Sequence, residues 1–528
     1  MDMSLRRSMG LAALLAILAS SAFGGTVSGT VKDPSGTPFK GAFVQARNLQ
    51  AKITYSVLSG PQGRYRMENL APGNYDIQVK AIGFKSEPRK GVQVETAAVP
   101  LDFSLQKGVV QWTDLSNHQA RQLLPPGKAK PMLVTTCFGC HGMQTRMAAR
   151  RQDEASWFRN VDYMRDSMRY FLRDQVNDEM AHELASYLTT NFGLDSAAPR
   201  SPADLPDYEK AKRGEFSDEA MKITFVDYDL PGPNRMPWSA APDRNGYHWI
   251  PYYGRANMVG KLDPKTGAIQ EFRAPYPGTA AIHSAVPAPD GSVWFTEQGS
   301  NRLGKLDPRT GEVGEFQAPL KDGIGVDRGS KHTVRVDAEG MVWATGAPFS
   351  RFDPKTETFH EFSEIPTAYG VALAADGTVW FTEFREDGKV GKVDPKTLKV
   401  TKYTPPTPNA RPRRIQIATD GTVWFAEYAS GKIGRLDPKT GAIKEYPLPG
   451  PSPTPYALGL DKDHNVWYSS MDMDVIGRLN PNTGAVTEFP FPYPENGMRE
   501  FHLDEQGRMW FGSPPNNKVG YFVLQAGR

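Results

Sequence analysis

The two cysteines of the chain lie close together in the stretch CFGCH, at Cys137 and Cys140, and His141 follows directly. The chain has 528 residues and contains only these 2 cysteines. One pair of thiols three residues apart cannot provide the set of disulfide bonds that stabilises small exported proteins. The spacing therefore indicates chemistry at the thiols themselves.

The pattern C-x-x-C-H is typical of covalent attachment of a c-type haem. Each thiol adds to one vinyl group, and the histidine that follows reaches the iron as the proximal ligand. We therefore expect one covalent haem c on Cys137 and Cys140, with His141 bound to the iron. A zinc site would need a further protein ligand. A thioredoxin-like redox pair would need a βαβ setting, whereas helices are expected here.

The segment after the motif has the periodicity of helices. In DEASWFRNVDYMRDSMRYF, one apolar stripe recurs at helical spacing, formed by Trp157, Val161, Met164 and Met168. A second helix is expected to begin at the N-cap Asn177 and to end before Gly193. Residues 107–205 are therefore predicted to form a small helical domain, which resembles a class I cytochrome c domain.

The distal iron ligand has several candidates: Met143, Met147, Met164, Met168, Met180 and His182. The pattern CFGCHGMQTRMAARRQDEASWFRNVDYM resembles a group of fused cytochromes that combine CxxCH, arginines and W-x3-V-x2-M. That resemblance implies Met164 as the ligand, and Met168, on the same helix face, is the alternative. For each of the others, a core position is the simpler interpretation.

The N-terminus reads as an export signal over residues 1–24. Arg6 and Arg7 precede the short apolar run from Leu11 to Leu18, and small residues end the segment. The run is too short for a stable membrane span. We expect a cleaved signal peptide and a periplasmic or secreted protein. The formal net charge of +3 with mixed signs gives no indication of nucleic acid binding.

Residues 25–106 alternate short β-rich runs with turns, which predicts a small β-sandwich. The stretches GTVKDPSGTPFKGAFV and GRYRMENLAPGNYDIQV resemble the carboxypeptidase regulatory-like domain. No catalytic constellation is visible in this segment. The resemblance implies a spacer or docking module, with carbohydrate or cell-surface contact as a further option.

Residues 206–528 repeat a unit of about 43 residues, which predicts a seven-bladed β-propeller. Each unit carries one tryptophan, at Trp249, Trp294, Trp343, Trp380, Trp424, Trp467 and Trp510. The recurring LDPKTG segments are expected to be hairpin turns, with proline and glycine at turn positions. The strand at 223–231 should complete the last blade and close the ring.

The repeat DGTVWFAEYASGKIGRLDPKTG resembles virginiamycin B lyase, a family that opens a cyclic depsipeptide by Mg²⁺-assisted elimination. Family histidines and a glutamate would correspond to Arg413, Thr454 and Tyr456 here, and a further acid would fall near Asp472. Arginine stays protonated and cannot act as a general base. We therefore expect lyase activity to be absent.

The position eleven residues before each repeat tryptophan should line the propeller channel. The seven residues are Trp238, His283, His332, Tyr369, Arg413, Tyr456 and Arg499. Aromatic, histidine and arginine side chains would suit a polar ligand that is anionic or aromatic. The alternative is that large side chains simply fill the channel.

These patterns predict an exported mono-haem c-type cytochrome that transfers electrons, with a propeller that binds a small-molecule substrate or a redox partner protein. One alternative is a periplasmic oxidoreductase with its substrate in the propeller channel. A second is a streptogramin-type C–O lyase, and a third is a cell-surface binding scaffold. The sequence identifies no catalytic residue.

Overall fold

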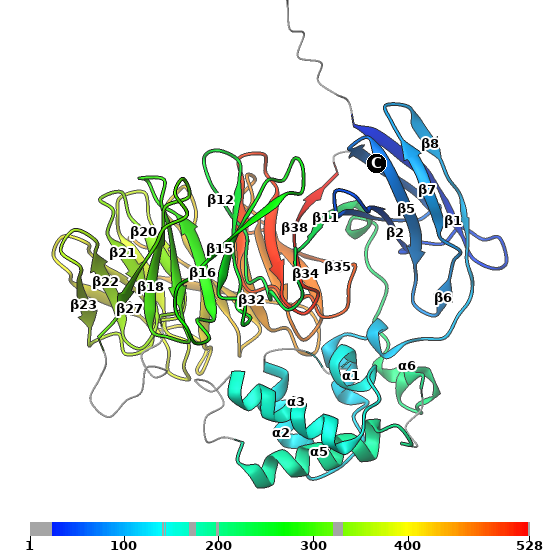
Figure 1. The fold of residues 1–528 in the computed structure, drawn as a ribbon, viewed down its shortest axis with the longest axis horizontal. Helices are drawn as coiled ribbons and strands as arrows, with labels where there is room; N and C mark the ends of the chain where they lie inside the picture. The colour runs from blue at the N-terminus through cyan, green and yellow to red at the C-terminus, as the bar shows by residue number, and fades with distance from the viewer. Residues whose placement is uncertain are drawn as a thin grey trace, which may run out of the picture.

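The computed structural model describes residues 24–139, 142, 144–167, 176–196, 200–319 and 331–525. Three parts are visible in Figure 1: a small β-sandwich, a group of helices and a large array of four-stranded sheets. The helices lie together beneath the sheet array and the sandwich. The predicted signal segment lies outside the described residues, apart from Gly24.

The N-terminal part is a β-sandwich, as predicted. One sheet has the order β4-β1-β8, with β9 also paired to β1, and β3-β2-β5-β7 form the other face. Alternating side chains such as Val44 and Ile77 point between the faces and are fully buried. The strands are β1 (Gly25–Lys32), β2 (Phe43–Asn48), β3 (Ile53–Leu58), β4 (Arg64–Leu70), β5 (Gly73–Lys80), β6 (Phe84–Lys85), β7 (Arg89–Val94), β8 (Ala98–Pro100), β9 (Phe103–Ser104) and β10 (Gln106–Lys107).

The middle part is helical. The Asn177 side chain accepts from Met180 N and caps α5, which ends at Phe192, before Gly193, as predicted. The shared core extends to Tyr208, beyond the boundary expected at 205. The helices are η1 (Trp112–Asp114), α1 (Asn117–Gln122), α2 (Lys130–Thr135), η2 (Cys137–Gly139), the π-helix η3 (Gln144–Ala148), α3 (Glu154–Ser167), α5 (Asp178–Phe192), η5 (Pro202–Asp204), α6 (Tyr208–Ala211) and η6 (Ala220–Lys222).

The C-terminal part is a propeller-like array of repeated antiparallel sheets. Six sheets have four strands in sequence order, and β36, β37, β38 and β11 form a further four-stranded unit. The first three units are β12 (Ala241–Pro242), β13 (His248–Pro251), β14 (Met258–Leu262), β15 (Ile269–Arg273); β16 (Ile282–Pro287), β17 (Val293–Glu297), β18 (Arg302–Leu306), β19 (Val313–Gln317); and β20 (Val334–Val336), β21 (Val342–Ala344), β22 (Phe349–Asp353), β23 (Thr358–Phe362).

The next three units and the closing strands complete the array, and every repeat tryptophan lies on the second strand of its unit. The strands are β24 (Val371–Leu373), β25 (Val379–Thr382), β26 (Val390–Val393), β27 (Val400–Tyr403); β28 (Pro412–Ile417), β29 (Val423–Glu427), β30 (Lys432–Leu436), β31 (Ile443–Pro447); β32 (Pro455–Leu460), β33 (Val466–Ser470), β34 (Val475–Leu479), β35 (Val486–Pro490); and β36 (Phe501–Leu503), β37 (Met509–Ser513), β38 (Lys518–Leu524), with β11 (Ile223–Asp229).

Two local features explain why each repeat folds alike. In four units the indole N–H of the buried tryptophan donates to an aspartate six residues earlier, as in Trp343 to Asp337 at 2.8 Å. The LDPKTG segment is a turn, as predicted: Gly267 N donates to Asp263 O at 2.9 Å, and Gly267 has a φ of +76°. The Asp263 side chain accepts from Lys265 N within the same turn.

Strand β11 closes the array and also joins it to the sandwich. It pairs antiparallel with β38 from Ile223 to Asp229, which confirms the predicted closure. Its other edge pairs antiparallel with β3 of the sandwich, a contact that the sequence analysis did not anticipate. One sheet therefore runs from β36 through β11 to β7 without a break.

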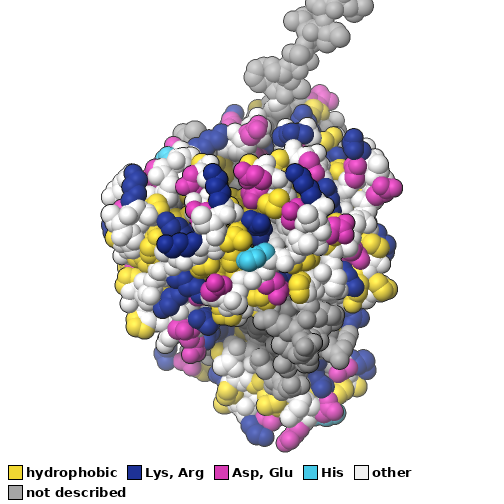
Figure 2. Space-filling view, turned by 90° about the vertical axis from the view of Figure 1, so that its left-hand side faces the viewer, with side chains coloured by type: hydrophobic (Ala, Val, Ile, Leu, Met, Phe, Trp, Pro, Cys, Tyr) yellow, Lys and Arg dark blue, Asp and Glu magenta, His cyan; other side chains and the backbone are white. Residues whose placement is uncertain are grey.

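Basic and acidic side chains are interspersed on the face of the molecule in Figure 2, in keeping with the small net charge. Within the described ranges, no helix combines the length and apolar character needed to cross a bilayer.

Candidate functional site

The described part of the CFGCH motif lies in the helical core. Cys137 begins η2 and packs, partly buried, against the hydrophobic cluster of the helices. The neighbouring Phe138 is buried in the same cluster. Cys140 and His141 lie outside the described residues. Thus the structure places one of the two motif thiols against an apolar core, a surface that would suit a porphyrin ring.

The candidate distal ligands differ in their surroundings. Met164 is partly buried on α3, whose Trp157 and Val161 face the helical core. Met147 and Met180 belong to or pack against that core. His182 is exposed, and its ring stacks on Phe158 at 4.2 Å. Met143 and Met168 lie outside the described residues, so Met164 is the stripe methionine whose position can be described.

A buried donor tests whether a haem fits this region. The Trp157 side chain is 2% exposed, and its Nε1 has no hydrogen-bond partner among the described residues. Buried N–H groups are normally paired, because leaving one unpaired costs about 1–3 kcal/mol. The propionate carboxylates of a haem are acceptors of the required kind. The apolar setting of Cys137 and this unmatched donor therefore fit the group.

The helical region docks on the propeller through Asp472. The Asp472 carboxylate accepts from Asn117 Nδ2 at 3.0 Å and forms an ion pair with Arg121. Its second oxygen also accepts from Ser452, and the Asp472 backbone carbonyl accepts from His118 N. Asp472 lies in the loop between β33 and β34, so α1 is bound to the rim of that unit.

A second carboxylate, Glu495, binds the segment that directly follows CFGCH. Glu495 Oε2 accepts from Gly142 N at 3.1 Å, and Oε1 accepts from Thr145 N at 3.1 Å and from the Thr145 hydroxyl. The Glu495 side chain is 5% exposed and its φ is +58°, a left-handed conformation that costs energy in a non-glycine residue. A Cβ on Gly142 would lie 2.3 Å from Gln144 Oε1 and 3.0 Å from Glu495 Cδ, so glycine allows both side chains to approach this backbone.

The structure brings the seven predicted channel residues together in a closed ring of contacts. The centroids of neighbouring aromatic rings are 5.7 Å apart for Trp238–His283, 3.6 Å for His283–His332 and 4.2 Å for His332–Tyr369. The two arginines complete the ring, with guanidinium-to-centroid distances of 4.9 Å for Arg413–Tyr369, 3.5 Å for Arg413–Tyr456, 5.1 Å for Arg499–Tyr456 and 4.4 Å for Arg499–Trp238. Six of the seven are buried and Tyr369 is half-buried. We call this set the channel ring.

Arg413 occupies an aromatic cage within the channel ring. Its guanidinium lies 3.5 Å from the Tyr456 ring centroid and 4.3–4.9 Å from those of Phe384, Tyr428 and Tyr369. Its Nη2 donates to the Tyr369 hydroxyl at 3.0 Å, and the Tyr369 and Tyr456 hydroxyls are hydrogen-bonded. Cation–π contacts of this kind stabilise a desolvated guanidinium.

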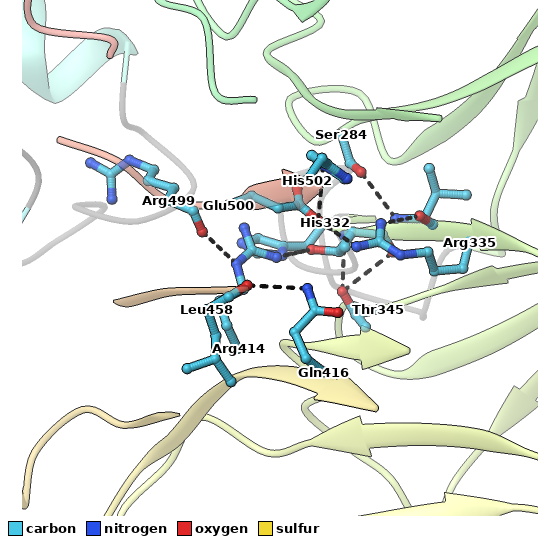
Figure 3. A network of polar contacts seen from close by, with 12 residues as sticks. Ser284, His332, Arg335, Thr345, Arg414, Gln416, Leu458, Arg499, Glu500 and His502 are labelled. Carbon is cyan, nitrogen blue, oxygen red and sulfur yellow. Dashed lines mark hydrogen bonds and ion pairs between the residues drawn. The ribbon is translucent and has the colours of Figure 1, made fainter. Parts of the chain in front are cut away.

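A polar layer lies one to three residues further along the same inner strands (Figure 3). Arg414 Nε donates to the Arg499 carbonyl at 2.7 Å, and Arg414 Nη1 donates to Thr333 Oγ1 at 2.8 Å. Arg335 forms a 2.5 Å ion pair with Glu500. In Figure 3 the Arg499 side chain points away from this layer, and its backbone carbonyl takes part in the layer as the acceptor for Arg414.

Burial and positive charge determine protonation here. Burial, followed by the neighbouring charged groups, lowers the pKa of His283 and His332 well below the ordinary value, so both are neutral. Burial alone would raise the pKa of Tyr456, but Arg413, Arg499 and Arg414 outweigh it and lower that pKa to about 7. Burial opposes ionisation of Glu500, yet Arg335 and Arg414 hold its pKa below the usual range.

Sequence reasoning missed several residues of this site. Arg414 and Glu500 each follow a predicted ring residue, so the same repeat register read one residue further would have found them. Phe384 and Tyr428 of the cage lie after the second strands of their units. Asp472 was considered only as a lyase acid, and Glu495 had no signal, because its partners lie about 350 residues away.

No group of three or more histidine, cysteine or acidic side chains within the described ranges is arranged to hold a metal ion. The CFGCH histidine is outside those ranges and is not part of that finding.

Comparison with known protein families finds matches for two parts of the chain. Residues 357–527 match the Virginiamycin B lyase family, and residues 26–106 match the carboxypeptidase regulatory-like domain. Residues 107–356 lie outside both matches. No curated protein matches the chain.

Solved structures share the propeller part. A streptogramin B lyase structure is 26% identical, with a TM-score of 0.53, and the match covers 58% of this chain and 100% of that chain. The virginiamycin B lyase from Staphylococcus aureus is 24% identical, with a TM-score of 0.52, covering 57% of this chain and all of that one. A catalytically inactive variant of that lyase, solved with quinupristin, gives the same values. This chain therefore carries a Virginiamycin B lyase family domain and, before it, a carboxypeptidase regulatory-like domain.

Proposed function

We propose that the chain is an exported mono-haem c-type cytochrome that transfers electrons, with a propeller that binds a small-molecule substrate or a redox partner protein. The observation that carries the proposal is the CFGCH motif, whose Cys137 packs into a helical core and whose following residues, Gly142 and Thr145, are bound to the propeller by Glu495. A haem at this position would belong to the helical domain and adjoin the propeller rim.

Each residue would have a defined role. Cys137 and Cys140 would hold the haem covalently, and His141 and Met164 would bind its iron. The haem supplies reversible one-electron chemistry when bound. Trp157 offers its indole N–H to a carboxylate, and the helical core excludes water from the apolar faces. Glu495 fixes the backbone one residue beyond the proximal ligand.

The propeller resembles a lyase, but its chemistry here argues for binding. Arg413 stands at a position where a base would be needed. Burial alone would lower its pKa, but Tyr369, Tyr456 and Tyr428 outweigh burial and raise that pKa, so Arg413 stays protonated. Asp472, the acid near the corresponding family position, is engaged by Asn117, Arg121 and Ser452. We expect no Mg²⁺-dependent ring opening of a type B streptogramin by the purified protein. Ring opening faster than the rate measured without protein would contradict this expectation and support the lyase interpretation.

Haem attachment can be tested by expression with the cytochrome c maturation machinery. The wild-type chain should give a haem-stained band after denaturing electrophoresis and a pyridine haemochrome spectrum of c type. The variant Cys137→Ala, Cys140→Ala should fold without covalent haem, and a surface variant such as Leu49→Ala should stain like the wild type. A soluble wild-type protein without stain would contradict the proposal.

The distal ligand can be tested in the same preparation. Thioether ligation gives ferric haem a weak near-infrared charge-transfer band and raises the potential relative to a second histidine. Met164→Ala should abolish the band and lower the potential, whereas Met147→Ala should leave the band in place. If Met168→Ala has the effect expected of Met164→Ala, the neighbouring stripe methionine is the ligand. Absence of the band in the wild type would favour His182 or an open iron site.

Export, the absence of nucleic acid binding, and carbohydrate or cell-surface contact through the sandwich remain predictions of the sequence. The export prediction can be checked by fractionation, which should place a protein shortened near Gly25 outside the cytoplasm.

A further inference from the structure

The channel ring and the adjoining polar layer, which contains Arg335, Arg414 and Glu500, hold more positive than negative charge. Arg335, Arg413 and Arg414 are always protonated, and among the described residues Glu500 is the one carboxylate in their network. Glu500 is already bound to Arg335. The guanidinium of Arg413 meets aromatic faces and the phenol groups of Tyr369 and Tyr456 instead of a carboxylate, and ionisation of Tyr456 adds one negative charge against the arginines. Removing charges from water without a partner of opposite sign is costly, so this cluster favours an anion.

The same place holds buried donors that lack acceptors. Trp238 Nε1, Arg413 Nε and Arg414 Nη2 are each shielded from solvent and have no hydrogen-bond partner among the described residues. The three side chains are between 5% and 8% exposed. Buried donors are normally satisfied, and here three of them belong to one ring and its adjoining layer. An oxyanion has several lone pairs and can accept from more than one of them.

We propose that the channel ring binds a small organic oxyanion, a carboxylate carried on a flat apolar body. The inference rests on the proposed binding role of the propeller and names the chemical class of its ligand. Arg413 and Trp238 provide donors for the charged group. A carboxylate suits them because guanidinium and carboxylate form charge-assisted hydrogen bonds.

The aromatic side chains of the site are the reason for proposing a ligand with a flat apolar body. Trp238 stacks on Tyr253 with centroids 4.1 Å apart and planes inclined by 12°, and the Arg499 guanidinium lies 4.4 Å from the Trp238 ring. Phe384 and Tyr428 continue the aromatic wall beside Arg413. Aromatic faces pack well against planar apolar groups.

The test is calorimetric titration of the full-length protein with benzoate as the probe. Benzamide has nearly the same shape without the charge, and inorganic sulfate has the charge without the ring. Benzoate should bind with saturation, and benzamide should bind at least tenfold more weakly, since charge-assisted hydrogen bonds exceed neutral ones by amounts of this order. Sulfate should also be weaker than benzoate. Equal binding of benzoate and benzamide, or no binding of benzoate, would overturn the proposal.

Variants assign the site. Arg413→Gln should weaken benzoate binding by roughly tenfold or more, and Trp238→Phe, which keeps an aromatic face and removes the N–H, by several-fold. The matched control is Arg435→Gln, because Arg435 also stacks on a tryptophan but is exposed on an outer strand. If Arg413→Gln unfolds the protein, the benzoate affinity of Trp238→Phe decides whether the channel ring is the binding site. Unchanged binding in the folded variants would place benzoate elsewhere and contradict the proposal.

The outcome is separable from haem attachment. The same titration on protein from cells with and without the maturation machinery should give benzoate binding in both, since no ring residue lies in CFGCH. Haem without benzoate binding would refute the oxyanion site and leave the cytochrome assignment standing. In protein from cells with the maturation machinery, benzoate binding without haem would refute the cytochrome assignment and leave the oxyanion site standing.

Discussion

The propeller is joined to its two neighbouring domains by different kinds of contact. At the sandwich, β11 pairs with β38 on one edge and with β3 on the other, so a continuous backbone ladder crosses the boundary. Apolar side chains such as Leu58 and Phe225 share one buried cluster there. At the helical domain, the described hydrogen bonds to the propeller centre on two carboxylates, Asp472 and Glu495.

This difference indicates two different roles. A ladder with a shared apolar core makes the sandwich part of the frame that closes the propeller. Side-chain hydrogen bonds can be broken one at a time without opening a sheet, so the helical domain is better described as docked. A docked domain beside the channel ring can respond to what the ring binds, whereas the sandwich cannot move without unpairing β11.

The largest expected effect comes from breaking the shared core. Phe225 is fully buried on β11, and Phe225→Ala should lower the free energy of unfolding by about 3–5 kcal/mol. Because β11 belongs to both parts, thermal unfolding should lose sandwich and propeller structure in one transition at a lower temperature. The control Leu49→Ala, at an exposed side chain of the sandwich, should change little. Two well-separated transitions would show that the parts are independent.

A local effect is expected at the docked junction. Glu495→Gln removes the charge that accepts from Gly142 and Thr145, and each lost charge-assisted hydrogen bond is worth about 1.5–3 kcal/mol. Hydrogen exchange at the two amides should accelerate, while the midpoint of global unfolding changes little. Glu505→Gln, at an exposed position on the same unit, is the control. Unchanged exchange in Glu495→Gln would mean that other contacts hold the segment.

The ion pair at the same junction should contribute less. A double-mutant cycle with Asp472→Asn and Arg121→Gln should give a coupling free energy of about 1 kcal/mol, read from protection of α1 amides against exchange. The value is smaller than for Glu495 because both side chains keep some contact with water. A coupling indistinguishable from zero would leave the backbone bond from His118 as the main contact of α1.

The smallest expected effect is the ionisation of Tyr456 in the channel ring. Tyr456 is faced by Arg413, Arg414, Arg499, Tyr369 and Tyr428. Its folded pKa of about 7 lies below the unfolded value of about 10, so its ionisation adds stability as pH rises from 7 towards 10, and that stability is lost as pH falls through 7. Ultraviolet difference spectra should show one phenolate forming near pH 7.

This phenolate signal should disappear in Tyr456→Phe and persist in Tyr163→Phe, an exposed position outside the ring. Bound benzoate should shift the signal to higher pH, since it competes for the same positive charge. A signal that survives in Tyr456→Phe would assign the phenolate to another tyrosine.

Repetition made much of the fold predictable. The tryptophan and DPKTG signals recur in each unit, so strand order, hairpin turns and the register of the channel ring follow from local pattern. The closure of β11 on β38 was also predictable, because the last unit lacks a strand. The pairing of β11 with β3 was not, since an edge strand gives no sequence signal of its partner.

The docking contacts were equally hidden. Asp472 and Glu495 bind residues about 350 positions away, and nothing in their local sequence indicates those partners. Arg414 and Glu500 were within reach, because they follow ring residues directly. The haem interpretation depends on five consecutive residues, of which the structure describes Cys137 to Gly139.

The most direct test of the central claim is the mass of the tryptic peptide 129–146, which contains CFGCH and is preserved because Pro131 follows Lys130. From protein matured in the presence of the cytochrome c machinery, the peptide should carry the mass of one haem, and neither Cys137 nor Cys140 should react with iodoacetamide. A folded protein whose peptide has the unmodified mass, with both thiols alkylated, would contradict the account.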